Sequence, residues 1–440
     1  MKYLKITFAL FLLIFPALIF PSTDMAFEVK QFNSGYSKLK ILILCQSEDK
    51  LLMNVGKLIS ENLDFTDQFD VDVKKTPQSL SSMCGDGIKK LFSQGFSIVA
   101  FVNGKTKRKK SEIKILVKDT NSDSVLFEKS FDINEKNFLH NTHSASNEII
   151  KTLTGEDGIC LSTLAYCKAL SSKHKVLCMS DYLCHKENVI ISDKTLNVAP
   201  SWHTKSPIIF FSQITKSNNR LMSFDLERKK KNIVCSYEGL NMQPSFSSSG
   251  KRVVLCLSGG KGNTDLFLYD QRVSSKVGKR VFKQLTKNGA NNVSPCMLPS
   301  GDVIFCSDSG SGLPQIYYLV MKTGETFRLS NGRGYCAAPS YCEKNNRLVY
   351  MRMVKDFFQL FSLSLDDLNN IREMQLTFDD CSKNEPSWSD CGRYIACSIE
   401  KTGSISQIGV LNFLSGKMRI LTKSPEPKSF PRWKNSRFWV

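Results

Sequence analysis

A pair of histidines offers the first residue spacing in this sequence that could support chemistry. His140 and His143 are three residues apart in a segment with helical periodicity, and that spacing could place two imidazoles beside one metal ion. The sequence places no carboxylate or cysteine beside them to complete a ligand set. We therefore predict that both histidines are surface residues and that the protein uses no metal and no cofactor.

The local motifs of hydrolytic enzymes are missing from the sequence. It contains no Gly-x-Ser-x-Gly nucleophile elbow and no His-Glu-x-x-His metalloprotease motif. A pair of carboxylates assembled from distant segments, as glycosidases use, stays open because such a pair leaves no local signal. We predict no catalytic residue, and we keep a secreted hydrolase or lyase acting on glycans as the alternative to a binding protein.

The chain is strongly basic, with a formal net charge of +19 over 440 residues. Such a charge favours encounters with anionic partners but does not define a fold. Two basic runs stand out, at Lys105–Lys110 and Arg228–Lys231, and both fall between expected strands. No RNA-binding, zinc-finger or helix-turn-helix motif accompanies them. We therefore predict solvated turns and no nucleic-acid partner.

The N-terminus has the features of a secretory signal. Lys2 and Lys5 precede an apolar run from Ile6 to Phe20, which Pro16 interrupts and which smaller or polar residues follow. The run is short for a membrane span, and no other apolar run approaches spanning length. We predict that residues 1–22 are a signal peptide cleaved between 22 and 26, and that the mature protein does not span the membrane.

Cysteine is frequent, with 15 residues, and the odd number leaves at least one thiol without a partner in the same chain. One position recurs in successive repeat strands and is occupied by Cys178, Cys256, Cys306 and Cys397, and by Phe211 and Met351 in the other repeats. A position that accepts Phe, Met or Cys is an apolar core position. We therefore expect buried thiols rather than a disulfide framework, although a few bridges stay open.

Residues 25–158 mix strand and helix patterns and predict a small α/β domain. Expected strands cover 40–45, 96–102, 112–118 and 125–131, and expected helices cover 51–63, 87–94 and 144–153. The last helix ends at Gly155, a usual residue at a helix C-terminus.

Residues 160–440 repeat a short unit built around proline. The six prolines are Pro200, Pro244, Pro295, Pro339, Pro386 and Pro431, each followed two residues later by an aromatic residue or methionine. Successive prolines are 44 to 51 residues apart, and four β-rich segments separated by turns recur between them. This pattern is typical of propeller blades, whereas a helical solenoid would need helical periodicity.

The number of segments predicts an all-β propeller of six blades. Pro431 belongs to a strand with no room for a blade after it, and the three segments at 161–167, 175–179 and 188–191 lack an innermost strand. Joining them makes the sixth blade, so that the C-terminal strand closes the ring and removes exposed edges. We expect each proline at the start of an inner strand, where a missing N–H is tolerated.

These features resemble the TolB family, the periplasmic propeller component of the Tol–Pal envelope system. The resemblance rests on Asp119 after the strand at 113–117, on the closing helix Glu148–Gly155, on the Pro-x-Trp/Phe-Ser-x-x-Gly units and on the Leu-Thr strand ends. The chain departs from the family in its cysteine content and in the altered units at Cys296 and Tyr341. The resemblance implies a non-enzymatic docking protein in the periplasm, expected to be a monomer, that supports outer-membrane integrity and envelope constriction at cell division.

The resemblance also implies the partners. They are a peptidoglycan-associated lipoprotein, which docks on one propeller face, and inner-membrane Tol proteins, which engage the N-terminal segment of the mature chain. The segments just before the inner strands match the family's docking face by position. The predicted partner-binding residues there are Asn197, Leu240, Asn241, Gln243, Asn292, Val293, Ser294, Asn384 and Glu385.

Asparagine stands three residues before the proline in three repeats, at Asn197, Asn241 and Asn292. These side chains either offer a ring of polar groups to a partner or form turns by bonding their own backbone. The sequence leaves both alternatives open.

Overall fold

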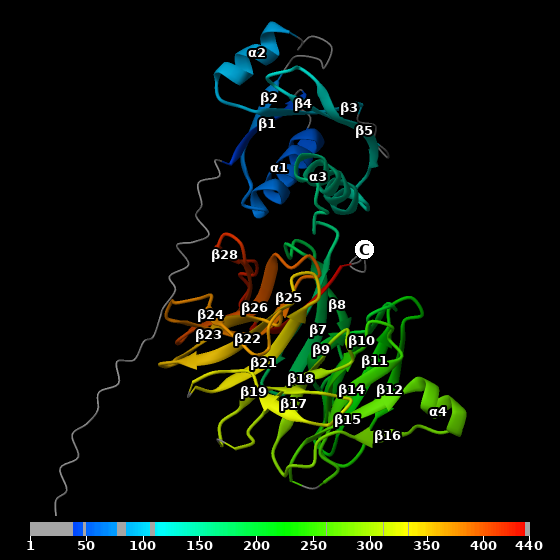
Figure 1. The fold of residues 1–440 in the computed structure, drawn as a ribbon. Helices are drawn as coiled ribbons and strands as arrows, with labels where there is room; N and C mark the ends of the chain where they lie inside the picture. The colour runs from blue at the N-terminus through cyan, green and yellow to red at the C-terminus, as the bar shows by residue number, and fades with distance from the viewer. Residues whose placement is uncertain are drawn as a thin grey trace, which may run out of the picture.

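The computed structural model describes residues 38–46, 50–76, 85–105, 111–260, 262–310, 312–332 and 334–435. The predicted signal peptide and its cleavage region lie outside these residues. The described chain forms an α/β part stacked on one end of a larger β-propeller (Figure 1).

The α/β part is a five-stranded sheet with helices on both faces. Its elements are β1 (Leu39–Gln46), α1 (Lys50–Phe65), β2 (Phe69–Thr76), α2 (Asp86–Ser93), β3 (Ile98–Lys105), β4 (Ser111–Asp119), β5 (Val125–Ile133) and α3 (Phe138–Thr154). The strand order is β2-β1-β3-β4-β5, with β1 parallel to both of its neighbours and the other pairs antiparallel.

Helices α1 and α3 lie side by side between the sheet and the propeller, while α2 covers the opposite face of the sheet (Figure 1). Alternate residues of β1 supply the two layers. Ile41 and Ile43 pack with α1 and α3, whereas Leu42 and Leu44 pack with α2. The α1–α3 layer is continuous with buried residues of the propeller, so the two parts share one core. Among the described helices, none is both long and apolar enough to cross a bilayer.

The predicted helices and strands of the α/β part are all present, with ends displaced by at most six residues. Helix α3 begins at Phe138 rather than 144. One strand was missed: β2 alternates Phe69, Val71 and Val73 with polar residues, and it pairs with β1 alone at the sheet edge.

The described propeller strands pair antiparallel, apart from a short parallel contact between Lys175 and Leu196. Four sheets have four strands each: β13 (Asn241–Phe246), β14 (Arg252–Leu257), β15 (Asp265–Asp270) and β16 (Phe282–Gln284); β17 (Asn292–Met297), β18 (Val303–Ser307), β19 (Gln315–Leu319) and β20 (Thr326–Arg328); β21 (Cys336–Cys342), β22 (Arg347–Val354), β23 (Phe357–Ser364) and β24 (Glu373–Gln375); β25 (Cys381–Trp388), β26 (Tyr394–Lys401), β27 (Gln407–Asn412) and β28 (Met418–Ile420). A short helix, α4 (Gln271–Val277), interrupts the first of these repeats and was not predicted.

The remaining strands form one sheet of eight. They are β6 (Thr163–Ser171), β7 (His174–Asp181), β8 (Asn188–Ile191), β9 (Leu196–Trp202), β10 (Ile208–Ile214), β11 (Asn219–Asp225), β12 (Lys230–Cys235) and β29 (Lys428–Lys434). The C-terminal strand β29 pairs with β6, with Lys428 opposite Lys168 and Trp433 opposite Leu164. This pairing is the contact that the closure hypothesis requires.

The six prolines lie inside the inner strands, so the expectation that they begin these strands is wrong. Each strand starts three to five residues earlier. The residue before each proline has a positive φ of 51–57°, and the pairing register shifts at that point. Such a bulge leaves its residues out of the ladder, so a proline without an N–H is tolerated there.

The recurring cysteine position is apolar core, as predicted. Cys178, Cys256, Cys306 and Cys397 are at most 2% exposed, and Phe211 is completely buried. All cysteines in the described part of the chain are free thiols. Burial raises the pKa of Cys306 to about 12, so the thiol stays protonated and behaves as a small hydrophobic side chain.

Candidate functional site

The two ends of the propeller are covered differently. In each sheet the strands are counted outward from the inner strand. The turns after the first and third strands lie at one end of the propeller. The turn after the second strand and the link to the next sheet lie at the other end. Turns of the first kind meet helices α1 and α3, so we call that end the domain face and the opposite end the far face. Figure 1 shows the α/β part lying over the domain face.

An ion pair joins the two parts on the domain face. Asp67, just after α1, accepts hydrogen bonds from Arg419 (Nη2 to Oδ1, 2.7 Å; Nη1 to Oδ2, 3.0 Å), from Asn412 (3.0 Å) and from Ser415 (2.9 Å). Burial alone would raise the pKa of Asp67, but these hydrogen bonds and the nearby positive charge outweigh it and lower the pKa. The three partners all lie on the β27–β28 hairpin, so the carboxylate holds this hairpin against α1.

Apolar contacts extend this junction. The Phe65 ring lies 5.0 Å from the Tyr182 ring and 5.1 Å from the Tyr394 ring, measured between centroids. The guanidinium of Arg419 lies 5.3 Å from the centroid of the same Phe65 ring, in cation–π geometry. The end of α1 is therefore enclosed by propeller residues.

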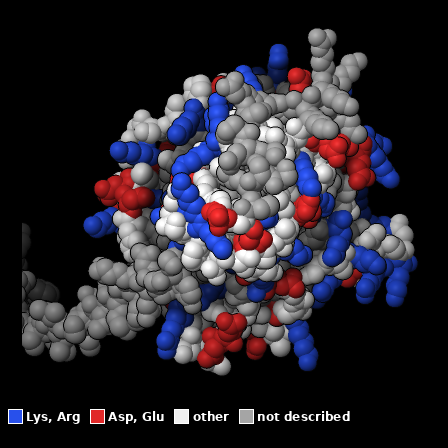
Figure 2. Space-filling view, turned by 90° about the horizontal axis from the view of Figure 1, so that it is seen from above, with Lys and Arg blue, Asp and Glu red and all other residues white. Residues whose placement is uncertain are grey.

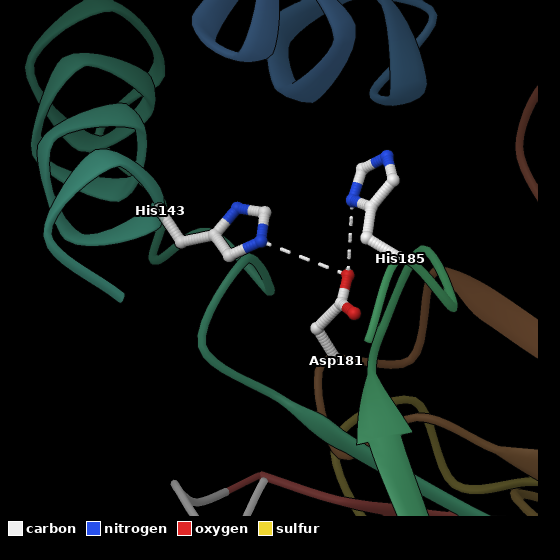
Figure 3. Close-up of side chains that lie close together, drawn as sticks. All are labelled: His143, Asp181 and His185. Carbon is white, nitrogen blue, oxygen red and sulfur yellow. Dashed lines mark ion pairs between the residues drawn. The ribbon is translucent and has the colours of Figure 1, made fainter. Parts of the chain in front are cut away.

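Two histidines converge on one carboxylate oxygen beside this junction (Figure 3). The Nδ1 of His185 lies 3.2 Å, and the Nε2 of His143 lies 3.7 Å, from Oδ2 of Asp181. His143 comes from α3, whereas Asp181 and His185 come from the end of β7 and the turn that follows. Asp181 also accepts hydrogen bonds from the amides of Leu183 (3.2 Å) and Lys186 (2.9 Å), and its side chain is completely buried.

The charges in this cluster reinforce one another. Burial would raise the pKa of Asp181, but the two histidines and the amide bonds prevail and hold it well below its usual range. Hydrogen bonds to Asp181 and to Glu61 raise the pKa of His185 to about 10. Buried polar groups normally find partners in this way.

Each imidazole also uses its second nitrogen. The Nδ1 of His143 lies 3.1 Å from Oδ1 of Asn62, and the Nε2 of His185 lies 3.1 Å from Oε2 of Glu61. The Nδ2 of Asn62 donates to Ser146 (2.7 Å), which leaves its Oδ1 as the acceptor for His143. The cluster is thus built from α1, α3 and the β7–β8 turn.

The prediction that His143 is a surface residue is wrong. Its side chain is completely buried, because the propeller covers this face of α3. His140 is partly buried and lies outside the cluster. Helical spacing in one segment gave no sign that a residue in a later β-turn would meet it.

The far face presents apolar side chains on its loops. Each is between 39% and 56% exposed, and the set is Tyr237, Leu240, Leu313, Phe378 and Ile405. They lie in the links before β13 and β25 and in the β18–β19 and β26–β27 turns. A groove of about 720 Å³ opens beside Leu240, with Glu238, Ser258 and Asn291 among its lining residues.

The three asparagines that stand three residues before a proline, Asn197, Asn241 and Asn292, are completely buried. The Nδ2 of Asn241 donates to the carbonyls of Asn219 (3.0 Å), Tyr237 (2.7 Å) and Gly239 (3.1 Å). Asn292 donates to the carbonyl of Ala290 (3.1 Å), and Asn197 to that of Lys175 (2.9 Å). Of the two alternatives, these contacts favour side chains that form the turn by bonding the backbone.

Other residues perform the same task in the remaining repeats. The residues three positions before the prolines there are Cys336, Lys383 and Lys428, and all are buried. The Nζ of Lys383 donates to the carbonyl of Cys381 (2.9 Å) and to Asp379, and the Nζ of Lys428 donates to Ser424. The position therefore caps the loop that enters each inner strand.

The other predicted residues are distributed between the channel and the far face. Gln243, Ser294 and Glu385 line a central channel of about 340 Å³, together with Asp390, Arg432 and other residues of the inner strands. Glu385 Oε2 accepts hydrogen bonds from Ser398 (2.7 Å) and from the amide of Phe430 (3.0 Å). Val293 and Asn384 are half-buried. Among the nine residues, Leu240 alone is more than a third exposed.

Charge is spread over the surface rather than gathered. Seen from above, on the side of the α/β part, lysine and arginine side chains are scattered around the periphery with acidic groups between them (Figure 2). Arg228 is highly exposed and lies 3.9 Å from Asp225, as expected of a solvated turn. Most of the other basic run, at 106–110, lies outside the described residues.

Comparison with known proteins identifies the family. The sequence profile of the TolB beta propeller domain matches residues 150–436. The chain belongs to the TolB propeller family. The resemblance inferred from the sequence is thus confirmed.

Several TolB proteins are similar to this chain. The Tol-Pal system protein TolB of Francisella tularensis subsp. mediasiatica (strain FSC147) is 25% identical over 309 residues, which cover 66% of this chain and 69% of the relative. That of Helicobacter pylori (strain ATCC 700392 / 26695) is 22% identical over 404 residues, covering 89% and 91%. The crystal structure of TolB from Acinetobacter baumannii matches with a TM-score of 0.77 at 19% identity, covering 90% of this chain and 97% of that one. At this identity, the structural match concerns the fold.

Within this TolB-family chain, sequence reasoning missed two groups of residues. It missed the exposed Tyr237, Leu313, Phe378 and Ile405, although each lies in a link or turn of the repeat and could have been found by asking which loop residues are apolar. It also missed Asp181 and His185, for which the sequence offers no comparable signal.

Proposed function

We propose that this protein is a non-enzymatic docking component of the Tol–Pal envelope system in the periplasm. Its propeller, with six blades and a ring closed by β29, binds a peptidoglycan-associated outer-membrane lipoprotein through the far face. In this role it supports outer-membrane integrity and envelope constriction at cell division. Membership of the TolB family supports the proposal, as do its relatives, which are named as Tol-Pal system proteins.

The observation that carries the proposal is the set of large apolar side chains exposed on the far-face loops. Five large apolar side chains are exposed there, on loops that the α/β part does not cover. Apolar side chains exposed on several loops of one face are available to contact a partner protein. A stable complex buries roughly 1,200–2,000 Å² in total. The groove beside Leu240 gives such a partner a concave place to insert a side chain.

The docking residues are accordingly divided by role. Leu240 contacts the partner directly, together with the four exposed apolar residues of neighbouring loops. Asn197, Asn241 and Asn292 hold the loops in shape through backbone hydrogen bonds. Gln243, Ser294 and Glu385 contact only a partner segment that enters the channel. Val293 and Asn384, on the same inner strands, complete the proposed set without lining the channel.

The rest of the chain follows the same proposal. Residues 1–22 form an export signal, residues 25–158 form the α/β domain, and residues 160–440 form the propeller of a monomer. The N-terminal segment of the mature chain engages the inner-membrane Tol proteins. The lipoprotein then occupies the opposite side of the molecule from the α/β domain.

The glycan-directed enzyme is the weaker candidate. Its carboxylates would be Glu385 and Asp390, which both line the channel. The carboxylate of Glu385 already accepts hydrogen bonds from Ser398 and Phe430, as a structural group does. Burial raises the pKa of Asp390, but a glycosidase needs a second carboxylate free to act opposite its acid.

Affinity capture with matched leucine variants tests the docking proposal. Leu240 on the far face and Leu414 on the domain face are 39% and 43% exposed. The wild-type chain and Leu414→Asp should both retain the lipoprotein from solubilised envelope, identified by mass spectrometry. Leu240→Asp should lose most of it, while melting at the same temperature. Equal retention by all three chains would rule out the far face, and retention of inner-membrane Tol proteins alone would rule out the lipoprotein.

A further inference from the structure

We propose that His143, Asp181 and His185 bind a single divalent transition-metal ion, of which zinc is the natural probe, at the junction between the α/β part and the propeller. This inference departs from the sequence-based expectation of no metal, and it is independent of the docking function. It rests on the arrangement of donor atoms in Figure 3.

The first observation is the convergence of three donors. One imidazole nitrogen from each histidine and one oxygen of Asp181 all lie within 4.8 Å of one another. Zinc–ligand bonds of about 2.0–2.2 Å place neighbouring ligands of a tetrahedral site about 3.4 Å apart. The nitrogen–oxygen distances of 3.2 Å and 3.7 Å to Asp181 bracket that value. These two spacings therefore need little change to admit an ion.

The second observation is the support behind each ligand. The ring nitrogen of His143 that points away from Asp181 is hydrogen-bonded to Asn62, and the corresponding nitrogen of His185 forms an ion pair with Glu61. Histidine ligands of metal sites almost always bond a carboxylate or carbonyl through the remote nitrogen, which fixes the ring and directs the near nitrogen at the ion. The carboxylate behind His185 has the form of a carboxylate–histidine–metal relay.

The donor set selects the class of ion. Two imidazoles and one carboxylate suit zinc and its neighbours among the transition metals. Calcium and magnesium require six or more oxygen ligands in most sites, which this cluster does not supply. The Sγ of Cys184 accepts a hydrogen bond from the Ser180 hydroxyl (3.5 Å) and is not one of the three candidate metal ligands.

An ion at this position would tie the two parts of the chain together. His143 belongs to α3, whereas Asp181 and His185 belong to the β7–β8 region of the propeller. A ligand that binds only the docked arrangement stabilises it in proportion to the logarithm of its concentration. The site thus makes domain docking sensitive to the supply of metal.

Zinc binding to the full chain, after treatment with EDTA, tests the inference. Equilibrium dialysis should show one tightly bound zinc per chain, and zinc should raise the melting temperature. His185→Gln and Asp181→Asn should abolish both effects. Glu61→Gln should weaken binding about 10-fold, as expected of a supporting carboxylate. His140→Gln is the matched control, because it removes a histidine of α3, the helix that carries His143, from outside the cluster. This variant should bind zinc as the wild type does.

Cobalt substitution keeps the test decisive if a variant fails to fold. Cobalt bound by two imidazoles and a carboxylate should give visible d–d bands without thiolate-to-metal charge-transfer absorption. A spectrum with thiolate absorption would assign the metal to cysteines and overturn the proposal. So would a wild-type chain that binds no zinc, or zinc binding that survives both His185→Gln and Asp181→Asn.

Discussion

The two faces of the propeller show opposite uses of the same repeat. On the domain face, the turns and adjoining strands carry Asp181, His185 and Arg419. Their polar atoms contact His143 of α3, Glu61 of α1 and Asp67 just after α1. On the far face, equivalent connections present Tyr237, Leu313 and Phe378 to solvent. Each repeat buries its inner strand in the same way, whereas the sequences of its turns differ.

This difference separates two tasks: the domain face holds the α/β part, and the far face is left for a separate protein. Polar and charged partners fix the α/β part in one orientation, because hydrogen bonds are directional and buried charges need specific partners. Exposed apolar side chains contribute to binding a separate protein, because burial there is favourable without fixed geometry. The loops of the far face still need internal support, and the buried residues before each proline provide it.

Removing strand β29 should have the largest effect on stability, because losing an inner strand would disrupt the propeller and with it both faces. A chain lacking Lys428–Val440 loses the pairing with β6 and the buried Trp433. We expect it to be unfolded or aggregated by circular dichroism and size-exclusion chromatography. A chain ending at Asn435 keeps β29 and should melt close to the parent. If both truncated chains melt like the parent, the C-terminal strand does not hold the ring.

Asn241→Ala should separate loop support from partner contact on the far face. The change leaves the carbonyls of Asn219, Tyr237 and Gly239 without a donor, which should cost about 3 kcal/mol of unfolding free energy. Chemical denaturation measures this loss. Leu240→Ala, one residue away and exposed, should change stability by less than about 0.5 kcal/mol. Equal losses in the two variants would mean that Asn241 is not a structural residue.

The sequence predicted the repeat and the α/β elements because both depend on local patterns. Proline spacing and β-rich segments located the inner strands, and the periodicity of α1 located its buried face. Contacts between distant segments leave no such pattern. His143 looked like a surface residue because its partners, Asp181 and Asn62, come from other elements. The asparagines could be read in two ways until their hydrogen bonds to the backbone were seen.

Arg419→Ala should weaken the domain face without affecting the far face. The variant loses two hydrogen bonds to Asp67 and the contact with the Phe65 ring. We expect a loss of about 2 kcal/mol in unfolding free energy, with faster proteolysis between α3 and β6. Lipoprotein affinity, measured by calorimetry on the folded variant, should stay within about twofold of the wild type. A large loss of affinity would show that the two faces are energetically coupled.

Lowering the pH should weaken the contact between Asp67 and the β27–β28 hairpin, with a smaller loss of stability than Arg419→Ala causes. The pKa of Asp67 is lowered in the folded protein, so its stabilising contribution is present above the unfolded pKa of about 3.9 and is lost as the pH falls through the folded value. Asp67→Asn should therefore be less stable than the wild type at pH 7, by about 1 kcal/mol. The difference should shrink on acidification below pH 4. A difference that stays constant with pH would show that the charge of Asp67 is not involved.

Hydrogen–deuterium exchange with and without the purified lipoprotein tests the division between the two faces most directly. We expect protection in the far-face loops at 236–240, 308–310 and 378–381, with unchanged exchange in the domain-face turns at 389–393 and 413–417. Protection confined to the domain-face turns, or absent from the loop that carries Leu240, would contradict this division.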